Sequence, residues 1–213
     1  MRTPHDIKRV AVLGAGLMGH GIALELAAHR RLVCLHDVSE QLLDKAIAHA
    51  RVGLKALHQA GLISFDEIEA SISRISTSLN LSETVEGTDL VIEAVSENLE
   101  LKHSLFDKVD RIAPAHAVLV SNTSTFLPSA LAAATQRPLQ FAGVHYYNPP
   151  HLLPGVEIIK GPETSDATVQ LLTGFYQMIG KRPALIYKEI QGFIGNRLQV
   201  ALLREAMSII RDG

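Results

Sequence analysis

Three glycines near the start of the chain are spaced so that they could bind a phosphate group. Gly14, Gly16 and Gly19 form the pattern G-x-G-x-x-G directly after the apolar run 10–13, and Asp37 follows 23 positions after the first glycine. Glycines in this pattern permit a tight turn, let the backbone approach a pyrophosphate and let a helix pack closely on a strand, while the carboxylate can bind a ribose. The pattern predicts a dinucleotide site. A carboxylate without a following arginine favours NAD over NADP, because it repels a 2′-phosphate. The plain alternative is a glycine-rich turn with a capping aspartate.

The elements that must position these residues follow from the hydrophobic pattern. Short apolar runs alternate with longer segments in which apolar residues recur at helical spacing. Strands are predicted at 10–13, 32–35, 74–78, 89–95, 118–120, 141–144, 156–159 and 184–187. Strands that alternate with helices need crossover connections, which produce a largely parallel sheet covered on both faces. The sequence therefore predicts an α/β fold with a doubly wound, Rossmann-type, mostly parallel sheet and helices on both faces.

Capping residues indicate where several helices begin. Ser39 is predicted to cap a helix that continues to about residue 60, and Ser64 with Glu67 matches the capping box S-x-x-E. Other helices are expected after the glycine loop, from about 165 and over about 193–211. One more helix carries an apolar stripe made of Leu101, Leu105, Val109 and Ile112.

Composition argues against several classes of protein. The 213 residues are 47% hydrophobic and 20% charged, as in folded soluble domains, and a net charge of -2 lacks the basic excess of a nucleic-acid binder. The stretch 10–28 contains His20, Glu25 and four glycines, and no signal-peptide pattern precedes it, so we expect no membrane span. The single cysteine, Cys34, cannot form an internal disulfide and lies in a predicted strand, where we expect it in the core. A cytoplasmic protein fits these features.

Five blocks of sequence together resemble the 3-hydroxyacyl-CoA dehydrogenases and their relatives, including the lambda-crystallin or L-gulonate dehydrogenase branch. The blocks are GAGLMGHGIA, DLVIEAVSENLELK, SNTST, HYYNPP with a glutamate twelve residues after its histidine, and KEIQGFIGNRLQ. They occur in order along essentially the whole chain. The resemblance implies NAD-dependent oxidation of the 3-hydroxyl of an (S)-3-hydroxyacyl-CoA to the 3-oxoacyl-CoA, a reaction of fatty acid metabolism.

The resemblance also implies roles for individual residues. The catalytic set consists of His145 as general base, Glu157 as its partner, and Ser124 and Asn196 as residues that orient the substrate. The cofactor contacts implied are Gly14, Gly16, Leu17, Met18, Gly19, Asp37, Glu97, Lys102, Asn122 and Asn148.

These residue types suit the implied reaction. Oxidation of a secondary alcohol needs a base for the hydroxyl proton, and histidine titrates near neutral pH. Glu157 lies in the apolar run 156–159, where a carboxylate is costly to bury unless it is paired. Each residue keeps a plain alternative: His145 as a loop histidine, Ser124 as a residue that closes a turn and Asn196 as part of the first turn of a helix. The other histidines lack the spacing of metal ligands, so no metal site is predicted.

The resemblance divides the chain into an NAD-binding domain, 1–190, and the first helix of a helical substrate and dimerisation domain, 191–213. We expect a homodimer, because apolar residues at this end would favour self-association: Ile194, Leu198, Leu202, Leu203, Met207 and Ile210. Gln191 and Gly155 stand where relatives usually have Pro and Leu, which bears on substrate preference more than on chemistry. Two alternatives remain open: a dehydrogenase of a free hydroxy acid such as L-gulonate or carnitine, and a non-catalytic NAD-binding or structural protein.

Overall fold

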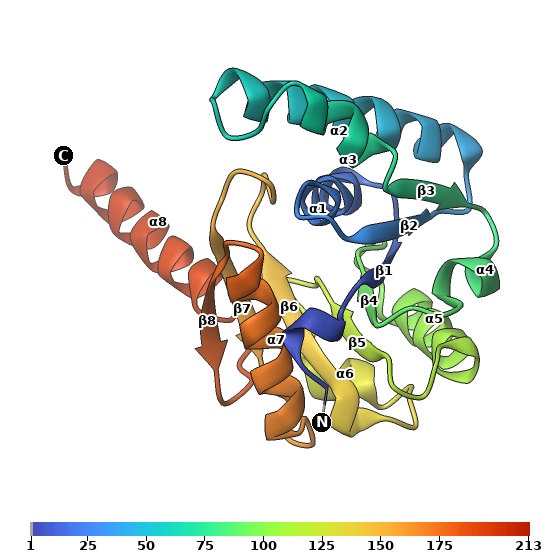
Figure 1. Ribbon diagram of the computed structural model, residues 1–213. Helices are drawn as coiled ribbons and strands as arrows, with labels where there is room; N and C mark the ends of the chain where they lie inside the picture. Colours follow the sequence, from blue (N-terminus) through green and yellow to red (C-terminus); the bar gives the residue numbers. More distant parts are fainter. Residues whose placement is uncertain (1) are drawn as a thin grey trace.

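One twisted sheet organises the protein. The structure, a computed structural model, describes residues 2–213, and within them eight strands follow the order β3-β2-β1-β4-β5-β6-β7-β8 (Figure 1). The strands are β1 (Arg9–Leu13), β2 (Leu32–His36), β3 (Ile75–Ser78), β4 (Leu90–Glu93), β5 (Val118–Ser121), β6 (Phe141–Tyr146), β7 (Gly155–Ile159) and β8 (Arg182–Ile186). Neighbours pair in parallel except β6 and β7, which are antiparallel. The chain moves outward from β1 in both directions, so the prediction of a doubly wound, mostly parallel sheet is confirmed.

Helices cover both faces of this sheet. They are α1 (Leu17–Ala28), α2 (Glu40–Gln59), α3 (Asp66–Ile72), α4 (Leu81–Val85), α5 (Leu99–Ile112), α6 (Pro128–Ala132), α7 (Asp166–Met178) and α8 (Gly195–Asp212). Val10 and Val12 of β1 join one core with α1, α2, α3 and α7, whereas Ala11 and Leu13 join a second core with α4, α5 and α6. Because successive side chains of a strand point to opposite faces, the sheet lies between two apolar layers. Helix α8 buries none of its residues and projects from the rest of the chain (Figure 1).

The buried face of α5 differs from the predicted stripe. Within the predicted stripe, Val109 is buried and Leu105 packs partly buried against the core, but Leu101 is 46% exposed and Ile112 is 39% exposed. Lys102 and Phe106, which lie outside the stripe, are buried. The helix is rotated so that Lys102 reaches a carboxylate on β4, and the aromatic Phe106 fills the core one turn later. The spacing of apolar residues cannot identify this buried face, because one of the residues on it, Lys102, is charged.

The beginning of α3 also differs from the prediction. The helix starts at Asp66 with Phe65 at its N-cap, and no side chain caps it. The carboxylate of Glu67 instead pairs with Arg30 at 3.3 Å and Arg74 at 3.5 Å. The sequence signalled a helix correctly, but its capping-box glutamate is used in tertiary contacts. The short helices α4 and α6 were not predicted.

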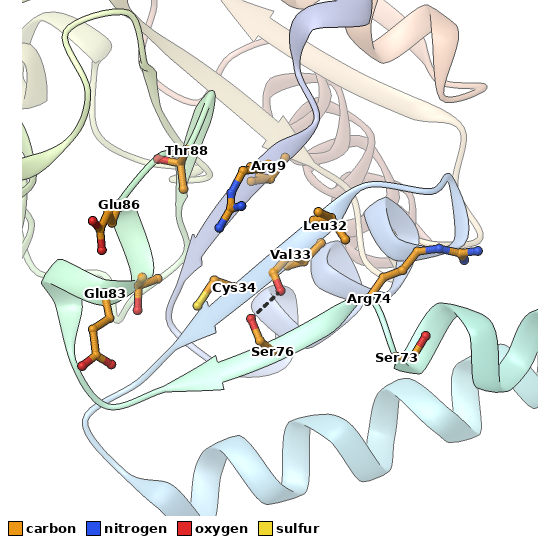
Figure 2. Close-up of a pocket in the computed structure, with 12 residues that line it drawn as sticks. Arg9, Leu32, Val33, Cys34, Ser73, Arg74, Ser76, Glu83, Glu86 and Thr88 are labelled. Carbon is orange, nitrogen blue, oxygen red and sulfur yellow. Dashed lines mark hydrogen bonds between the residues drawn. The ribbon is translucent and has the colours of Figure 1, made fainter.

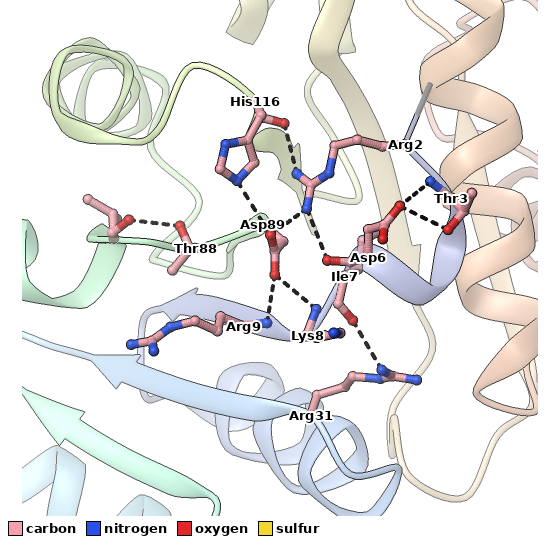
Figure 3. Close-up of polar contacts among 11 residues, drawn as sticks. Arg2, Thr3, Asp6, Ile7, Lys8, Arg9, Arg31, Thr88, Asp89 and His116 are labelled. Carbon is pink, nitrogen blue, oxygen red and sulfur yellow. Dashed lines mark hydrogen bonds and ion pairs between the residues drawn. The ribbon is translucent and has the colours of Figure 1, made fainter.

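The N-terminal segment is held to the sheet by one carboxylate. Asp89, just before β4, accepts hydrogen bonds from the backbone amides of Lys8 and Arg9 at 2.9 Å each and forms an ion pair with Arg2 (Figure 3). His116 Nε2 lies 3.4 Å from the same carboxylate. Burial alone would raise the pKa of Asp89, but these hydrogen bonds outweigh it and lower that pKa. The cluster joins β1 to β4 where both strands begin.

Cys34 lies in β2 as predicted, but it is half-buried rather than part of the core. Figure 2 shows it between Arg9 of β1 and Ser76 of β3, on the wall of a cavity of about 260 Å³. Glu83 and Thr84 of α4 line the same cavity. Among residues 2–213, no helix is both long and apolar enough to cross a membrane.

Candidate active site

The glycine loop after β1 has the geometry that a bound pyrophosphate requires. Gly14 has a φ of +103°, and a Cβ there would lie 2.5 Å from the carbonyl oxygen of Ala94. A Cβ on Gly19 would lie 1.7 Å from the carbonyl oxygen of Gly14, so neither position admits another residue. Gly16, the N-cap of α1, has no atom within 4 Å of a built Cβ. The second glycine thus leaves open space at a helix N-terminus, which favours an anion.

Asp37 lies next to this loop, directly after β2. Its Oδ2 accepts a hydrogen bond from the amide of Ala15 at 2.9 Å, and its Oδ1 accepts one from the amide of Ser39 at 3.3 Å. Asp37 is half-buried, so its carboxylate remains partly accessible beside the loop. The structure therefore places this carboxylate against the glycine loop, and its contact with a ribose stays a prediction.

A cavity of about 360 Å³ adjoins the glycine loop, at the ends of β4 and β5. It is lined by Gly16, Leu17, Met18, Ala94, Val95, Ser96, Glu97, Lys102, Asn122 and Ser124. Parallel α/β sheets bind ligands at the carboxyl ends of their strands where the strand order reverses, which here is between β1 and β4. Most of the predicted cofactor contacts thus meet in one cavity. Asn148 is not among the residues that line it and lies in the exposed loop after β6.

A cluster of charged side chains, made of the buried Glu93 and Lys102 and the exposed Glu97, lies at one wall of this cavity. Lys102 Nζ lies 2.6 Å from Glu93 Oε1 and 3.1 Å from Glu97 Oε2. Ser121 donates its hydroxyl hydrogen to Glu93, and Thr123 donates its own to Glu97. Lys102 is 1% exposed and Glu93 is fully buried. The hydroxyl groups of Ser121 and Thr123 thus join the end of β5 to the end of β4. Removing either Glu93 or Lys102 would leave the other as a buried charge without its partner.

Glu93 is a residue that the sequence reasoning missed. It ends the apolar strand β4, and both of its oxygens accept hydrogen bonds within the fold. Its position in an apolar run could have identified it, because burying a carboxylate costs free energy unless the carboxylate is paired. The same argument had drawn attention to Glu157.

His145 and Glu157 form a buried pair on neighbouring strands. His145 Nδ1 lies 2.6 Å from Glu157 Oε2, and the exposed fractions of the two residues are 7% and 1%. Glu157 Oε1 accepts hydrogen bonds from the amides of Ile194 and Gly195, both at 2.9 Å. Burial alone would raise the pKa of Glu157, but the hydrogen bonds from His145, Gly195 and Ile194 outweigh it and hold that pKa below its usual value. The carboxylate is therefore ionised at neutral pH.

Ser124 and Asn196 complete the group of predicted catalytic residues. Asn196 Nδ2 donates a hydrogen bond to the carbonyl oxygen of Ser124 at 3.4 Å, and Ser124 lines the cavity beside the glycine loop. Asn196 follows Gly195, whose amide binds Glu157. A continuous series of contacts therefore brings together all four of the predicted catalytic residues, although they come from four separate segments. Their individual roles stay predictions.

Asn122 lines the cavity, and a hydrogen bond within the fold fixes its side chain. Its Oδ1 accepts a hydrogen bond from the amide of Tyr146 at 3.0 Å, which joins the end of β5 to the end of β6.

Within residues 2–213, no group of three or more His, Cys, Asp or Glu residues is arranged to hold a metal ion. The arrangement offers a dinucleotide cavity beside a histidine–carboxylate pair.

Known proteins share this arrangement of the chain. Residues 9–190 match the family described as 3-hydroxyacyl-CoA dehydrogenase, NAD binding domain. The chain is 39% identical to mitochondrial hydroxyacyl-coenzyme A dehydrogenase of Sus scrofa, over 97% of this chain and 67% of the relative. It is 37% identical to lambda-crystallin of Oryctolagus cuniculus, over 96% of this chain and 64% of the relative.

A solved structure gives the same result. The (S)-3-hydroxybutyryl-CoA dehydrogenase from Ralstonia eutropha superposes with a TM-score of 0.91 at 32% identity, covering 97% of this chain and 72% of that one. The chain spans about two thirds of the length of these curated relatives. The glycine loop, the cavity and the sequence similarity agree, and the chain therefore belongs to the 3-hydroxyacyl-CoA dehydrogenases, a family of NAD-dependent oxidoreductases, with residues 9–190 as the NAD-binding domain.

Proposed function

We propose that the chain catalyses NAD-dependent oxidation of the 3-hydroxyl group of an (S)-3-hydroxyacyl-CoA to the 3-oxoacyl-CoA. The observation that carries the proposal is the buried His145–Glu157 pair, with 2.6 Å between Nδ1 and Oε2, joined through the start of α8 to the residue that lines the cofactor cavity. A histidine–carboxylate pair beside a dinucleotide cavity suits an alcohol that loses a proton to the protein and a hydride to the cofactor.

His145 takes the proton from the substrate hydroxyl in this proposal. Glu157 binds Nδ1, which leaves Nε2 as the ring nitrogen that faces the substrate. The imidazolium formed is stabilised by the ionised carboxylate, whose pKa is held low by its hydrogen bonds. Ser124 and Asn196 hold the hydroxyl and the neighbouring carbonyl group in a reactive orientation.

The glycine loop, Asp37, Glu97 and Lys102 hold NAD in this proposal. The open space at Gly16 admits the pyrophosphate, and the half-buried carboxylate of Asp37 binds ribose hydroxyls while it repels a 2′-phosphate. NAD, when bound, accepts the hydride that leaves the substrate carbon. The chain's own residues supply binding, orientation and the proton acceptor.

We extend the proposal to the end of the chain, where 191–213 would begin a helical domain that contributes to substrate binding and dimerisation. Support comes from α8, which buries none of its residues and exposes large apolar side chains, among them Leu202 at 72% and Ile210 at 80%. Apolar surface of this extent favours a partner. A cytoplasmic location and a part in fatty acid metabolism belong to the same proposal.

A second candidate is a dehydrogenase of a free hydroxy acid. It is favoured by the 37% identity to lambda-crystallin and by Gly155, half-buried at the start of β7, at a position where relatives usually have Leu. The two candidates use the same His145 and the same cofactor cavity. They differ in whether CoA is needed for recognition.

The test is consumption of NADH, followed by absorbance, when the chain is mixed with acetoacetyl-CoA or with free 3-oxo acids. NADH binding is measured separately by calorimetry. We expect consumption with the CoA ester. Consumption with free acids alone would replace the proposal by the second candidate. NADH binding without consumption of any substrate would contradict both and favour a non-catalytic NAD-binding protein.

A further inference from the structure

Phe193, just before α8, has a backbone conformation that is unusual for its residue type. Its φ is +48°, in the left-handed region, which is unfavourable for any residue that carries a Cβ. Within residues 2–213, the other non-glycine residue with a positive φ is Arg30, which is exposed, whereas Phe193 is fully buried. A strained conformation persists only where the surrounding structure holds it in place.

The ring of Phe193 packs on the side of the sheet that carries the His145–Glu157 pair. It forms a small apolar cluster with Ile159 of β7 and Ile186 of β8. Its centroid lies 5.7 Å from that of the His145 ring, with an angle of 54° between the two rings. Ile159 and Glu157 point to the same face of β7, because alternate residues of a strand share a face. The buried ring therefore fixes the chain directly beside the pair.

The turn at Phe193 directs two consecutive amides at one carboxylate oxygen. The amides of Ile194 and Gly195 both donate to Glu157 Oε1 at 2.9 Å. Ile194 has a φ of −91° and a ψ of −54°, so a left-handed residue is followed by a right-handed one. Successive amides in such a sequence of conformations converge and form a concave site for an anion. The left-handed conformation of Phe193 is what brings the two donors together.

Tyr147 confines the same turn from another direction. Its ring meets the His145 ring edge to face, with centroids 5.2 Å apart. A Cβ on Gly195 would lie 2.7 Å from Cε1 of Tyr147, so the backbone of Gly195 lies close against this ring. The turn is thus packed between two aromatic side chains, Phe193 and Tyr147, that both contact the histidine.

We propose that Phe193 is a positioning residue for the general base, whose buried ring holds a left-handed turn that points the amides of Ile194 and Gly195 at Glu157. The inference rests on the proposed function and adds to its site a residue that does not touch the reacting atoms. Without the ring, the turn relaxes to a favourable conformation in which the two amides no longer converge. Glu157 then loses donors, and the orientation that it gives to His145 becomes less precise.

The first experiment compares Phe193→Ala with Phe193→Gly. Both changes remove the ring, but glycine adopts the left-handed conformation without strain and alanine does not. Hydrogen exchange of the Ile194 and Gly195 amides is followed by NMR, relative to the amides of β5, which corrects for changes in global stability. We expect exchange to accelerate by about tenfold or more in Phe193→Ala and by less in Phe193→Gly.

Phe193→Leu extends this series with a milder change. It keeps an apolar side chain in the cluster with Ile159 and Ile186, so its exchange rate should lie between those of the wild type and the alanine variant. It also provides the comparison with the wild type if the alanine variant does not fold.

Phe175 provides the matched control. It is fully buried in the interior of α7, where glycine is less favourable than alanine. Urea denaturation should therefore show that Phe175→Gly is less stable than Phe175→Ala, which is the opposite order to that expected at position 193. The relative exchange rates of the Ile194 and Gly195 amides should stay unchanged in both control variants.

Kinetic measurements connect the turn to the proposed reaction. We expect Phe193→Ala to lower kcat by about tenfold, because the base is less well oriented, and Phe193→Gly to recover part of the loss. The dissociation constant for NADH should not change, since Phe193 does not line the cofactor cavity. Unchanged exchange in Phe193→Ala, or exchange in Phe193→Gly as fast as in the alanine variant, would overturn the inference. A wild type without turnover would contradict the proposed function alone, because hydrogen exchange needs no substrate.

Discussion

His145 and Glu157 are direct partners in the antiparallel pairing of β6 with β7, so the register of two strands sets the geometry of the pair. The second oxygen of Glu157 is bound by the first amides of α8 and the residue before it. The pair is thus held by a sheet on one side and by a helix start on the other. Support from two sides fixes the relative positions of the two side chains.

Replacing His145 by Ala should lower kcat by roughly two to four orders of magnitude, because it removes the general base. The dissociation constant for NADH should stay nearly unchanged, since His145 is not among the residues that line the cofactor cavity. Steady-state kinetics and calorimetry measure the two quantities. His5→Ala is the control, because His5 is exposed in a short helix and does not line the cofactor cavity. Full turnover in His145→Ala would exclude this residue as the base.

Asp37→Ala should weaken NADH binding by about tenfold or more, the worth of a hydrogen bond to a charged group. The loss has two parts, because Asp37 also accepts a hydrogen bond from the Ala15 amide in the glycine loop. NADPH binding should weaken less, since a repulsion is removed at the same time. Asp44→Ala on the exposed face of α2 provides the comparison. Equal dissociation constants for the two variants would remove Asp37 from the site.

Glu93→Gln should destabilise the fold and weaken NADH binding together. The change leaves Lys102 buried with only Glu97 as a charged partner, at 3.1 Å. Breaking a buried pair from one side costs about 3 kcal/mol or more, and Glu97 should reduce that loss. Urea denaturation measures the free energy of unfolding. Lys102→Met added to Glu93→Gln should recover part of the stability, and a further loss in the double variant would contradict the pairing.

The stability of the protein should fall as pH rises through the titration of Glu25. This carboxyl is 5% exposed, and burial raises its pKa to about 7 despite the opposing charge of Lys181, whose Nζ lies 2.6 Å away. The folded chain therefore keeps a proton that the unfolded chain releases above its ordinary value of 4.5. The contribution is complete below that value and is lost as pH approaches about 7, amounting to at most about 3 kcal/mol.

Urea denaturation of the wild type and of Glu25→Gln, at about pH 5 and about pH 8, measures this effect. The free energy of unfolding of the wild type, relative to that of Glu25→Gln, should be larger at about pH 5 than at about pH 8. Glu40→Gln is the control, because Glu40 is exposed at the start of α2. Parallel pH profiles for wild type and Glu25→Gln would show that Glu25 does not titrate in this range.

Self-association through α8 should appear as a mass that increases with protein concentration in sedimentation. The exposed apolar residues of this helix supply the surface, and Leu198 and Leu202 lie one turn apart on it. Replacing both by Glu should restore the monomer. A monomer at all concentrations in the wild type would contradict self-association through this helix.

Most of the fold could be predicted from apolar runs, capping residues and glycine spacing, which are local patterns in the sequence. The eight apolar runs correspond to the eight strands, and Ser39 caps α2 by accepting a hydrogen bond from the Leu42 amide. Gly14 and Gly19 have the tight turn and the close packing that their spacing implied. The apolar runs, the cap and the packing of Gly19 on Gly14 each depend on residues within a few positions of one another, so the sequence contains this information directly. The carbonyl group of Ala94, which also confines Gly14, comes from a distant segment and is not part of that local signal.

Features that depend on distant partners could not be predicted in this way. Lys102 is buried because Glu93 lies opposite on another element, and this pair sets which face of α5 is covered. Tyr147 fits beside the site because a glycine 48 positions later leaves space for it. The resemblance to a family indicated the four catalytic candidates, but the contacts that join them appear only when the chain is folded.

The hydrogen bond from the Ala15 amide to Asp37 has a consequence for protein engineering. In the proposed site, a switch of preference toward a phosphorylated dinucleotide would begin by removing this carboxylate, and that step also removes an anchor of the glycine loop. The loop cannot compensate with larger side chains, since Gly14 and Gly19 are confined by backbone atoms. A redesigned chain therefore needs a second substitution that supplies a new hydrogen-bond acceptor for the Ala15 amide. Cofactor preference and the conformation of the glycine loop would then have to be changed together.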